Sequence, residues 1–437
     1  MKVKTFNGGT HPPEFKELAE SSKIEKMPPP EKVFISLSQH IGAPCKPVVE
    51  PGDEVKTGQL IGEGEGFVTS TVHATISGTV KKIEKFPSPI GTRPQMIHIE
   101  GDGQDEKAAA WKEDDWRKLS IKEMKNRIAQ AGIVGMGGAA FPTNVKLSPP
   151  NDKKIDTFII NGCECEPFLT ADHRMMLENS NQLLEGIRII MKILEVENGI
   201  IGIEDNKPDA IELLRKATSE DENISVEIVK TKYPQGAEKN LIDAILQRRV
   251  PAGGLPMDVG VVVNNVGTAI SVAQAVRSQK PLIERVVTVT GQGIEEPKNV
   301  LVRIGTPFKE LIQFCGGLKP NTKKLINGGP MMGIAQHTVD VPVIKGTSGI
   351  LALTEDTTVD SREFTCIRCG KCVETCPMGL LPTRIARLIE YDKINMAEDI
   401  GAMSCIECGS CSFVCPSNLP LVQRIRIGKQ LINEKNS

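Results

Sequence analysis

The sequence has few aromatic residues and no excess of charge of either sign. Phe, Trp and Tyr make up 4% of its 437 residues, and 53 lysines and arginines nearly balance 55 aspartates and glutamates. The chain therefore has few aromatic side chains on which bases could stack and no excess of positive charge for binding phosphates. These two deficits argue against nucleic-acid binding.

Long apolar runs are also missing. The N-terminal stretch MKVKTFNGGTHPPEF lacks the apolar core of a secretory signal, and no later stretch supplies the ~20 uninterrupted apolar residues that a transmembrane helix needs. We therefore expect a soluble cytoplasmic chain with no transmembrane segment of its own. Any membrane role is expected to come through partners or peripheral docking.

Cysteine, in contrast, is abundant and unevenly distributed. Eight of the 12 cysteines fall between Cys366 and Cys415. Because the chain shows no export signal and the cytosol keeps thiols reduced, a disulfide framework is not expected and metal binding is favoured. The eight cysteines form two motifs, CIRCGKCVETCP and CIECGSCSFVCP, each with the spacing C-x-x-C-x-x-C-x-x-x-C-P.

This spacing predicts two [4Fe–4S] clusters, because three thiolates of one motif bind one cube while the fourth, before proline, reaches the other cube. Paired zinc sites are the alternative, but tetrahedral zinc needs neither a third C-x-x-C step nor the proline. By the convention of this motif the two predicted ligand sets are Cys366, Cys369, Cys372 and Cys415, and Cys405, Cys408, Cys411 and Cys376.

The residues from 1 to 104 have the pattern of a small all-β unit, with short apolar runs separated by PGD, TG and SG turns. The stretch from Gly52 to Leu60 resembles a half-repeat of the barrel-sandwich fold of biotinyl and lipoyl carrier domains. Those carriers hold an exposed lysine on a hairpin tip, whereas the corresponding stretch here, EGFVTS, has none. We expect the barrel-sandwich fold without the swinging arm.

Three further units follow along the chain. Residues 115–275 read as an α/β domain, in which IDTFIING and VGVVVNNVG are buried strands that each end in an asparagine-bearing turn. HRMMLENSNQLLEGIRIIMKIL and AEKNLIDAILQRR are predicted to be amphipathic helices of this domain. Residues 283–355 form a compact α+β module with one helix, PFKELIQFC, and residues 360–437 a helical module with the two cluster motifs.

The stretch GIVGMGGAAFPT matches the dinucleotide fingerprint G-x-G-x-x-G/A at Gly135, Gly137 and Ala140. A Rossmann fingerprint follows a strand and opens a helix. Here a helical stripe with Ser120 as a plausible N-cap comes before the glycines, and the proline-rich FPTNVKLSPP after them discourages a long helix. The glycines are therefore interpreted as room for a cofactor against bare backbone, in a different architecture.

This loop, followed in order by NGCECEP, YPQGAE and NNVGT, resembles the flavin-bearing, NADH-oxidising subunit of respiratory complex I. With the carrier-like front and the ferredoxin-type back, the whole chain resembles the C subunit of the Rnf complex, an ion-pumping ferredoxin:NAD⁺ oxidoreductase. The stretch from Val286 to Gly333 is similar to the β-grasp (SLBB-like) module of both families. The resemblance implies an all-β barrel-sandwich, an α/β domain for FMN and NAD(H), a β-grasp module and a helical dicluster ferredoxin domain.

The resemblance also implies a set of cofactor-binding residues. It places bare backbone at Gly135, Gly137 and Gly138 against the flavin, Lys146 near the FMN phosphate, and Phe141 where it can stack on the nucleotide. The remaining positions line the isoalloxazine and nicotinamide or complete the pocket: Asn161, Glu164, Glu166, Tyr233, Gly236, Glu238, Asn264, Asn265 and Thr268. The complex I subunit has arginine where Met136 stands, aspartate where Cys163 stands, and a second aromatic near Pro149.

The implied function is electron entry or exit. NADH or NAD⁺ exchanges hydride with FMN, and single electrons pass to or from the two clusters, with no general acid or base from the chain. Integral-membrane and ferredoxin-like partner subunits translocate Na⁺ or H⁺, and this chain is peripheral on the cytoplasmic face of the membrane. Two alternatives stay open: a non-catalytic electron-transfer or scaffold subunit with a vestigial flavin pocket, and a soluble dehydrogenase subunit.

Overall fold

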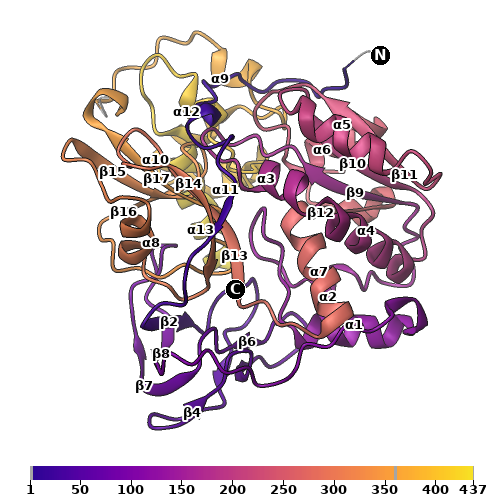
Figure 1. Ribbon diagram of the computed structural model, residues 1–437. Helices are drawn as coiled ribbons and strands as arrows, with labels where there is room; N and C mark the ends of the chain where they lie inside the picture. Colours follow the sequence, from indigo (N-terminus) through magenta and orange to yellow (C-terminus); the bar gives the residue numbers. More distant parts are fainter. Residues whose placement is uncertain (1–2, 359–361, 437) are drawn as a thin grey trace.

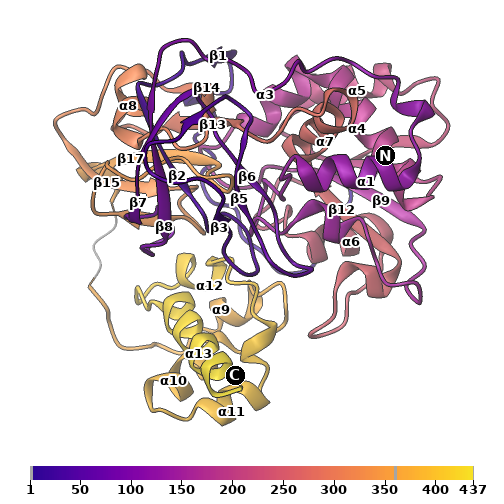
Figure 2. The same ribbon diagram turned by 90° about the horizontal axis from the view of Figure 1, so that it is seen from below.

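The computed structural model describes residues 3–358 and 362–436 of the chain. The expected start of the last module, residue 360, lies outside this part. Figure 1 shows an α/β domain beside two β-rich modules, and Figure 2 shows the helical C-terminal module beneath them. Within the described ranges, no helix is long and apolar enough to cross a membrane.

The N-terminal β module consists of two small sheets that enclose one apolar core. The first contains β2 (Lys32–Ser36), β8 (Gln95–Gly101), β7 (Gly78–Lys85) and β4 (Glu54–Val55), in that order. The second contains β3 (Lys46–Pro47), β5 (Leu60–Glu63) and β6 (Val72–His73). Alternate residues such as Val33, Ile35, Ile97 and Ile99 are buried between them, as period-2 patterning requires.

The segment before β2 does not join these two sheets. Lys4 forms a β-bridge with Val229, Thr10 forms another with Tyr233, and β1 (Ile24–Lys26) pairs in parallel with β14 (Lys298–Arg303). Its backbone therefore completes the edges of other modules. Edge pairing over such long separations leaves no local pattern in the sequence, so these contacts could not be expected from it.

The central domain is a parallel sheet with helices packed on it, as expected. The strand order is β11 (Ile224–Val229), β10 (Gly199–Glu204), β9 (Thr157–Gly162) and β12 (Val261–Asn265). The helices are α1 (Ile121–Gln130), α2 (Thr143–Lys146), α3 (Ala171–Glu178), α4 (Ser180–Leu194), α5 (Pro208–Ala217), α6 (Glu238–Leu246) and α7 (Val266–Ser278).

One helix prediction needs correction. The stretch HRMMLENSNQLLEGIRIIMKIL forms two helices, α3 and α4, because Asn179 adopts a non-helical conformation with φ of −122° and interrupts the ladder. Asparagine competes with the helix backbone for hydrogen bonds, which explains a break at this residue. The predicted N-cap is correct: Ser120 and Glu123 form a reciprocal capping box at the start of α1.

The third module is a six-stranded sheet with one helix against it. Its order is β1, β14, β13 (Glu284–Thr290), β17 (Gly349–Thr354), β15 (Thr322–Asn327) and β16 (Ile334–Gln336). The predicted helix is α8 (Phe308–Phe314), and its buried Phe308, Leu311 and Ile312 pack into the core of the sheet.

The C-terminal module is helical, as its sequence predicts. It contains α9 (Lys371–Glu374), α10 (Pro382–Glu390), α11 (Ile394–Asp399), α12 (Ser410–Phe413) and α13 (Leu421–Asn436). The apolar stripe of α10 meets α13 through Ile385, Ile389, Ile425 and Ile432. The two cysteine motifs run through the short helices of this module: Cys372 lies in α9 and Cys411 in α12.

Candidate functional site

The glycine loop is a closed turn between α1 and α2. Val134 forms a β-bridge with Pro142, and the amide of Gly135 donates to the carbonyl of Phe141 at 2.9 Å. The helix that follows, α2, has only four residues. The loop therefore neither follows a strand nor opens a long helix, which confirms that the fingerprint match is not a Rossmann site.

Side chains of the sheet's carboxyl edge support this loop. The amide of Met136 donates to Oγ1 of the buried Thr268 at 3.0 Å, at the start of α7. A Cβ added at Gly137 would lie 2.7 Å from Nδ2 of Asn265, whereas one added at Gly138 would meet no atom within 4 Å. Gly137 thus allows close packing on Asn265, and Gly138 faces open space.

The acidic loop NGCECEP follows β9 at the same edge of the sheet. Asn161, at the end of β9, is the register partner of Asn265, at the end of the neighbouring β12. The Asn161 Nδ2 donates to the carbonyl of Gly236 at 2.7 Å, which connects this loop to the YPQGAE stretch. Three of the four predicted stretches, NGCECEP, YPQGAE and NNVGT, therefore meet at this edge of the sheet. The glycine loop packs on Asn265 of the third.

The two glutamates of the acidic loop bind backbone amides. Glu164 accepts from the amides of Asp172 (2.7 Å) and His173 (3.1 Å) at the start of α3. Glu166 accepts from the amides of Met331 (3.1 Å) and Met332 (2.9 Å) in the β-grasp module. Burial raises the pKa of Glu166 to about 7 in spite of these two amides. Both side chains fix the loop to neighbouring elements.

Lys146, the last residue of α2, forms an ion pair with Glu238 of α6. Nζ of Lys146 is 3.2 Å from Oε2 of Glu238, the first residue of α6, and both side chains are partly exposed. An ammonium held at this position by a single, partly exposed carboxylate is available to an incoming phosphate.

Two buried amide side chains at the site have polar atoms without a hydrogen-bond partner. Asn264 is 4% exposed and its Nδ2 is unpaired; Gln235 is fully buried and neither its Nε2 nor its Oε1 is paired. An unpaired buried amide is costly, so such atoms mark positions where a polar ligand fits. Together with the open space at Gly138, they fit a flavin nucleotide. Gln235 is not among the residues predicted from the sequence. It lies in a turn, and only its burial distinguishes it from an ordinary turn residue.

Two of the three positions that depart from the complex I pattern lie in apolar cores. Met136 is 6% exposed and packs with the main core of the α/β domain, and Cys163 is fully buried against β10 and α6. Burial raises the pKa of the Cys163 thiol well above its usual value. The sulfur of Cys165 accepts a hydrogen bond from the amide of Gly236 at 3.3 Å, so it connects the acidic loop to the YPQGAE stretch.

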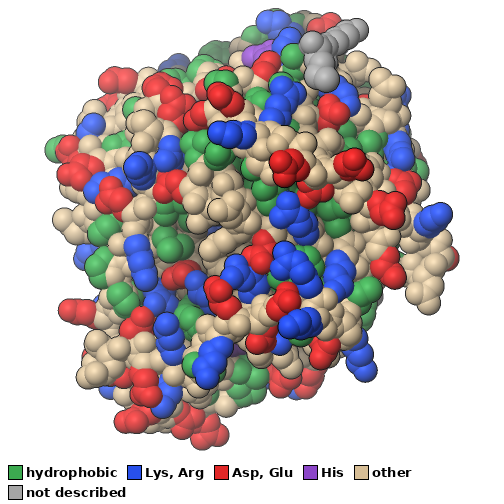
Figure 3. Space-filling view, turned by 45° about the vertical axis from the view of Figure 1, so that its right-hand side comes forward, with side chains coloured by type: hydrophobic (Ala, Val, Ile, Leu, Met, Phe, Trp, Pro, Cys, Tyr) green, Lys and Arg blue, Asp and Glu red, His purple; other side chains and the backbone are tan. Residues whose placement is uncertain are grey.

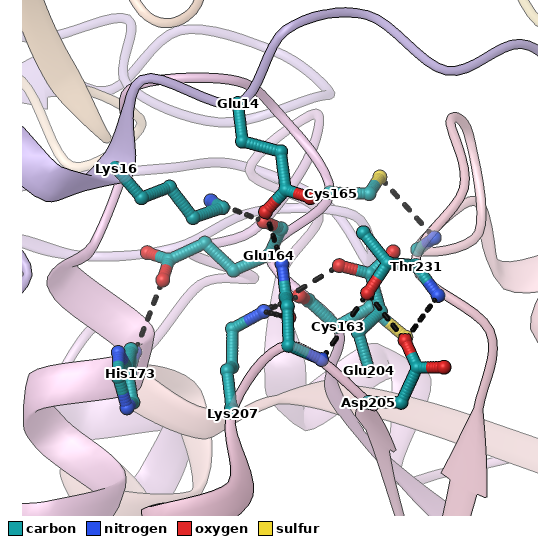
Figure 4. Close-up of polar contacts among 12 residues, drawn as sticks. Glu14, Lys16, Cys163, Glu164, Cys165, His173, Glu204, Asp205, Lys207 and Thr231 are labelled. Atoms are coloured by element: carbon teal, nitrogen blue, oxygen red, sulfur yellow. Dashed lines mark hydrogen bonds and ion pairs between the residues drawn. The ribbon is translucent and has the colours of Figure 1, made fainter.

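Figure 4 shows that buried lysines gather behind the acidic loop, a feature that the sequence did not predict. Lys16 donates to the carbonyl of Glu164, and Lys207 donates to the carbonyl of Cys163 at 2.7 Å and lies 3.4 Å from Glu204. Burial raises the pKa of Glu204 to about 7. Neither lysine stands in a motif, and each comes from an ordinary polar stretch.

The second predicted cluster set lines one cavity. Cys376, Cys405, Cys408 and Cys411 surround it together with apolar residues such as Leu380, Pro382 and Ile425. Four thiols from both motifs around one apolar cavity fit a [4Fe–4S] cube.

The first predicted set lies nearer the surface. Cys369 is exposed, Cys366, Cys372 and Cys415 are partly buried, and the Cys372 sulfur is 2.9 Å from Oγ1 of Thr383. Apolar side chains next to Cys366 in the sequence are exposed, among them Phe364 and Ile367 at 56% and 68%. The two sets therefore differ in burial, one facing the other modules and one facing outward.

The face of the molecule in Figure 3 carries interspersed acidic and basic side chains without a broad patch of one sign. This distribution agrees with the nearly balanced composition.

Models of four known domain families match successive parts of the chain. The RnfC barrel sandwich hybrid domain matches residues 4–104, the Nuo51 FMN-binding domain residues 128–274, the SLBB domain residues 286–335 and the 4Fe-4S dicluster domain residues 359–416. The expected order of barrel-sandwich, FMN-binding, SLBB and dicluster modules is thereby confirmed.

A solved structure shares the fold over part of its length. The NAD⁺-reducing [NiFe]-hydrogenase in the air-oxidized state has a chain that aligns with a TM-score of 0.50 at 16% identity, covering 67% of this chain and 60% of that one.

Curated relatives match over most of their lengths. The C subunit of the proton-translocating ferredoxin:NAD⁺ oxidoreductase complex of Clostridium ljungdahlii is 53% identical over 91% of this chain and 87% of its own. The Na⁺-translocating counterpart of Acetobacterium woodii is 48% identical over 99% of this chain and 98% of its own. The C subunit of the ion-translocating oxidoreductase complex of Rhodobacter capsulatus is 43% identical over 99% and 84%. The chain belongs to the family of C subunits of the ion-translocating ferredoxin:NAD⁺ oxidoreductase, or Rnf, complexes.

Proposed function

We propose that this chain is the subunit at which a membrane-bound ferredoxin:NAD⁺ oxidoreductase exchanges electrons with NAD(H). Hydride passes between the nicotinamide and FMN, and single electrons pass between FMN and two [4Fe–4S] clusters. One observation carries the proposal: the YPQGAE stretch, which holds the unpaired amide of Gln235, is joined to the thiol-lined cavity through a hydrogen bond from Tyr233 to Cys408.

FMN, when bound, converts the two-electron chemistry of NAD(H) into one-electron steps. The chain's own residues orient it and keep it in place. We assign contact with the ring system to the backbone at Gly135, Gly137 and Gly138, and the phosphate to Lys146. The other residues of the predicted set are assigned to the lining of the pocket, Gly236 through its backbone, and Gln235 is added to them. Phe141, partly exposed beside the loop, is assigned to the nucleotide.

The cluster bound by Cys376, Cys405, Cys408 and Cys411 is assigned as the nearer to the flavin. Its cavity wall contacts three other parts of the chain: Tyr233 of the α/β domain at Cys408, Gly8 of the N-terminal segment at Cys376, and Met331 of the β-grasp module at Gly409. The more exposed cluster, bound by Cys366, Cys369, Cys372 and Cys415, is assigned to exchange with a partner.

The partners are the integral-membrane and ferredoxin-like subunits of an Rnf-type complex, which carry the translocation of Na⁺ or H⁺. The chain associates with them peripherally, and we place it on the cytoplasmic face. The module boundaries that we assign are 1–104, 115–275, 283–355 and 360–437.

A reconstituted full-length chain tests this function. Loaded with FMN and iron–sulfur clusters, it should show a flavin absorbance that NADH bleaches, followed by reduction of the clusters. A chain that takes up iron but no FMN would instead be the electron-transfer or scaffold subunit with a vestigial pocket. Recovery of the native protein in washed membranes, against recovery in the soluble fraction, separates the complex-bound subunit from a soluble dehydrogenase.

A further inference from the structure

Two buried lysines from outside the α/β domain lie behind the two candidate flavin loops. Lys16 belongs to a one-turn helix, Lys16–Leu18, in the N-terminal segment, and Lys345 follows the β-grasp sheet's strand β16. They are 5% and 1% exposed. Neither belongs to the segment that matches the FMN-binding domain, residues 128–274.

Lys16 holds the acidic loop through three carbonyl oxygens. Its Nζ donates to Glu164 at 2.8 Å, to Glu166 at 3.1 Å and to Leu169 at 2.6 Å, which uses all three of its hydrogens. Figure 4 shows the side chain reaching from the N-terminal segment toward Glu164. The loop is thus wrapped around an ammonium group whose direct partners are neutral oxygens.

Lys345 holds the beginning of the glycine loop in the same manner. Its Nζ donates to the carbonyl of Gly132 at 2.7 Å and to that of Thr71, in the barrel-sandwich module, also at 2.7 Å. Arg285 donates to the carbonyl of Lys345 and extends to the carbonyl of Met136 inside the loop at 3.5 Å. Three modules therefore meet beneath this loop.

Burying an ammonium group against neutral carbonyls is costly unless negative charge is close by. Burial lowers the pKa of Lys345 to about 7, and burial together with the nearby Lys207 lowers the pKa of Lys16 in spite of the neighbouring Glu164 and Glu204. A nucleotide phosphate, or the additional negative charge of a reduced flavin, is the kind of group that compensates such a site.

We propose that Lys16 and Lys345 are positioning residues of the FMN site, contributed by the flanking modules: they fix the two flavin loops and supply positive charge that favours the reduced cofactor. This inference rests on the proposed function. It implies that the α/β domain alone does not form a complete flavin site.

Variants of the full-length protein, reconstituted with FMN and clusters, test the inference. Lys16→Met and Lys345→Met should each raise the FMN dissociation constant by about tenfold, because each loses charged hydrogen bonds to a loop. They should also shift the midpoint potential of bound FMN to more negative values, since the reduced form loses a favourable charge. Fluorescence titration and spectroelectrochemistry measure the two quantities.

Two further variants separate charge from packing. Lys16→Arg keeps the charge, so it should hold the midpoint potential of bound FMN closer to the wild-type value than Lys16→Gln, which keeps a donor but no charge. Lys192→Met is the matched control, because Lys192 also donates to two carbonyls, those of Arg117 (2.8 Å) and Leu119 (3.1 Å), in neither loop. It should leave both FMN quantities unchanged.

Iron content and the cluster signals in electron paramagnetic resonance report correct folding. With these intact, wild-type affinity and potential in both methionine variants, or in Lys16→Gln if Lys16→Met does not fold, would overturn the inference. Lower thermal stability in Lys16→Met and Lys192→Met alike, with an unmoved potential, would overturn it too. A wild-type protein that binds no FMN would instead contradict the proposed function.

Discussion

The hydroxyl of Tyr233 donates a 2.7 Å hydrogen bond to the backbone carbonyl of Cys408, and both residues are buried. Tyr233 belongs to the stretch YPQGAE that the family resemblance places in the flavin pocket, whereas Cys408 is a predicted cluster ligand. The same residue therefore joins the flavin side of the molecule to the cluster side.

Removing this hydroxyl should weaken the junction without removing the flavin pocket. In Tyr233→Phe the ring still fills its buried position, but the carbonyl of Cys408 loses its donor, at a cost of about 1 kcal/mol. We expect slower reduction of the clusters after NADH is mixed with the FMN-loaded protein. Tyr391→Phe is the control, because Tyr391 is 68% exposed. Equal stopped-flow rates in the two variants would contradict a role for this contact.

The two clusters should respond differently to loss of one ligand each. Cys408→Ser and Cys369→Ser should each lower the iron content by about half, because each disrupts one [4Fe–4S] cluster. In Cys369→Ser, NADH should still reduce the cluster that remains. In Cys408→Ser the flavin should bleach while the remaining cluster stays oxidised, as followed by electron paramagnetic resonance. The reverse pattern would show that the exposed cluster is the nearer to the flavin.

Features set by short-range chemistry could be predicted from the sequence. Ser120 and Glu123 cap α1 within one turn, and the asparagines that end β9 and β12 come together because parallel strands present their carboxyl ends at one edge. The spacing of the cysteine motifs predicts both ligand sets, and one of them lines a single cavity.

Features set by contacts far apart in the sequence could not be predicted. The hydrogen bonds of Lys16 span about 150 residues, and β1 pairs with a strand more than 270 residues later. Gln235 reads as an ordinary turn residue until the fold shows that its amide is buried and unpaired. Such residues carry no local pattern, so only the assembled modules reveal them.

Glu166 should make the stability of the protein depend on pH in a defined direction. Burial raises its pKa from 4.5 to about 7, so the folded state binds this proton more tightly than the unfolded state does. Its contribution is therefore most favourable below pH 4.5 and is lost as the pH rises through 7. The thermal unfolding midpoint of the wild type, measured relative to that of Glu166→Gln, should therefore fall as the pH rises from 4.5 to 7. A difference that is constant with pH would contradict the assignment.

Two adjacent glycines should separate the packing role of the glycine loop from its cofactor role. In Gly137→Ala the new methyl group meets Nδ2 of Asn265 at 2.7 Å, and Asn265 is held by Asp172 at 2.6 Å, so the cofactor-free protein should lose about 1–3 kcal/mol of stability.

In Gly138→Ala the methyl group meets no protein atom within 4 Å. The cofactor-free protein should then unfold at the wild-type temperature or slightly above it, while FMN binds more weakly because the methyl group occupies space assigned to the flavin. Thermal unfolding without FMN and fluorescence titration with FMN distinguish the two variants. Wild-type FMN affinity in Gly138→Ala would mean that the flavin does not lie against this part of the loop.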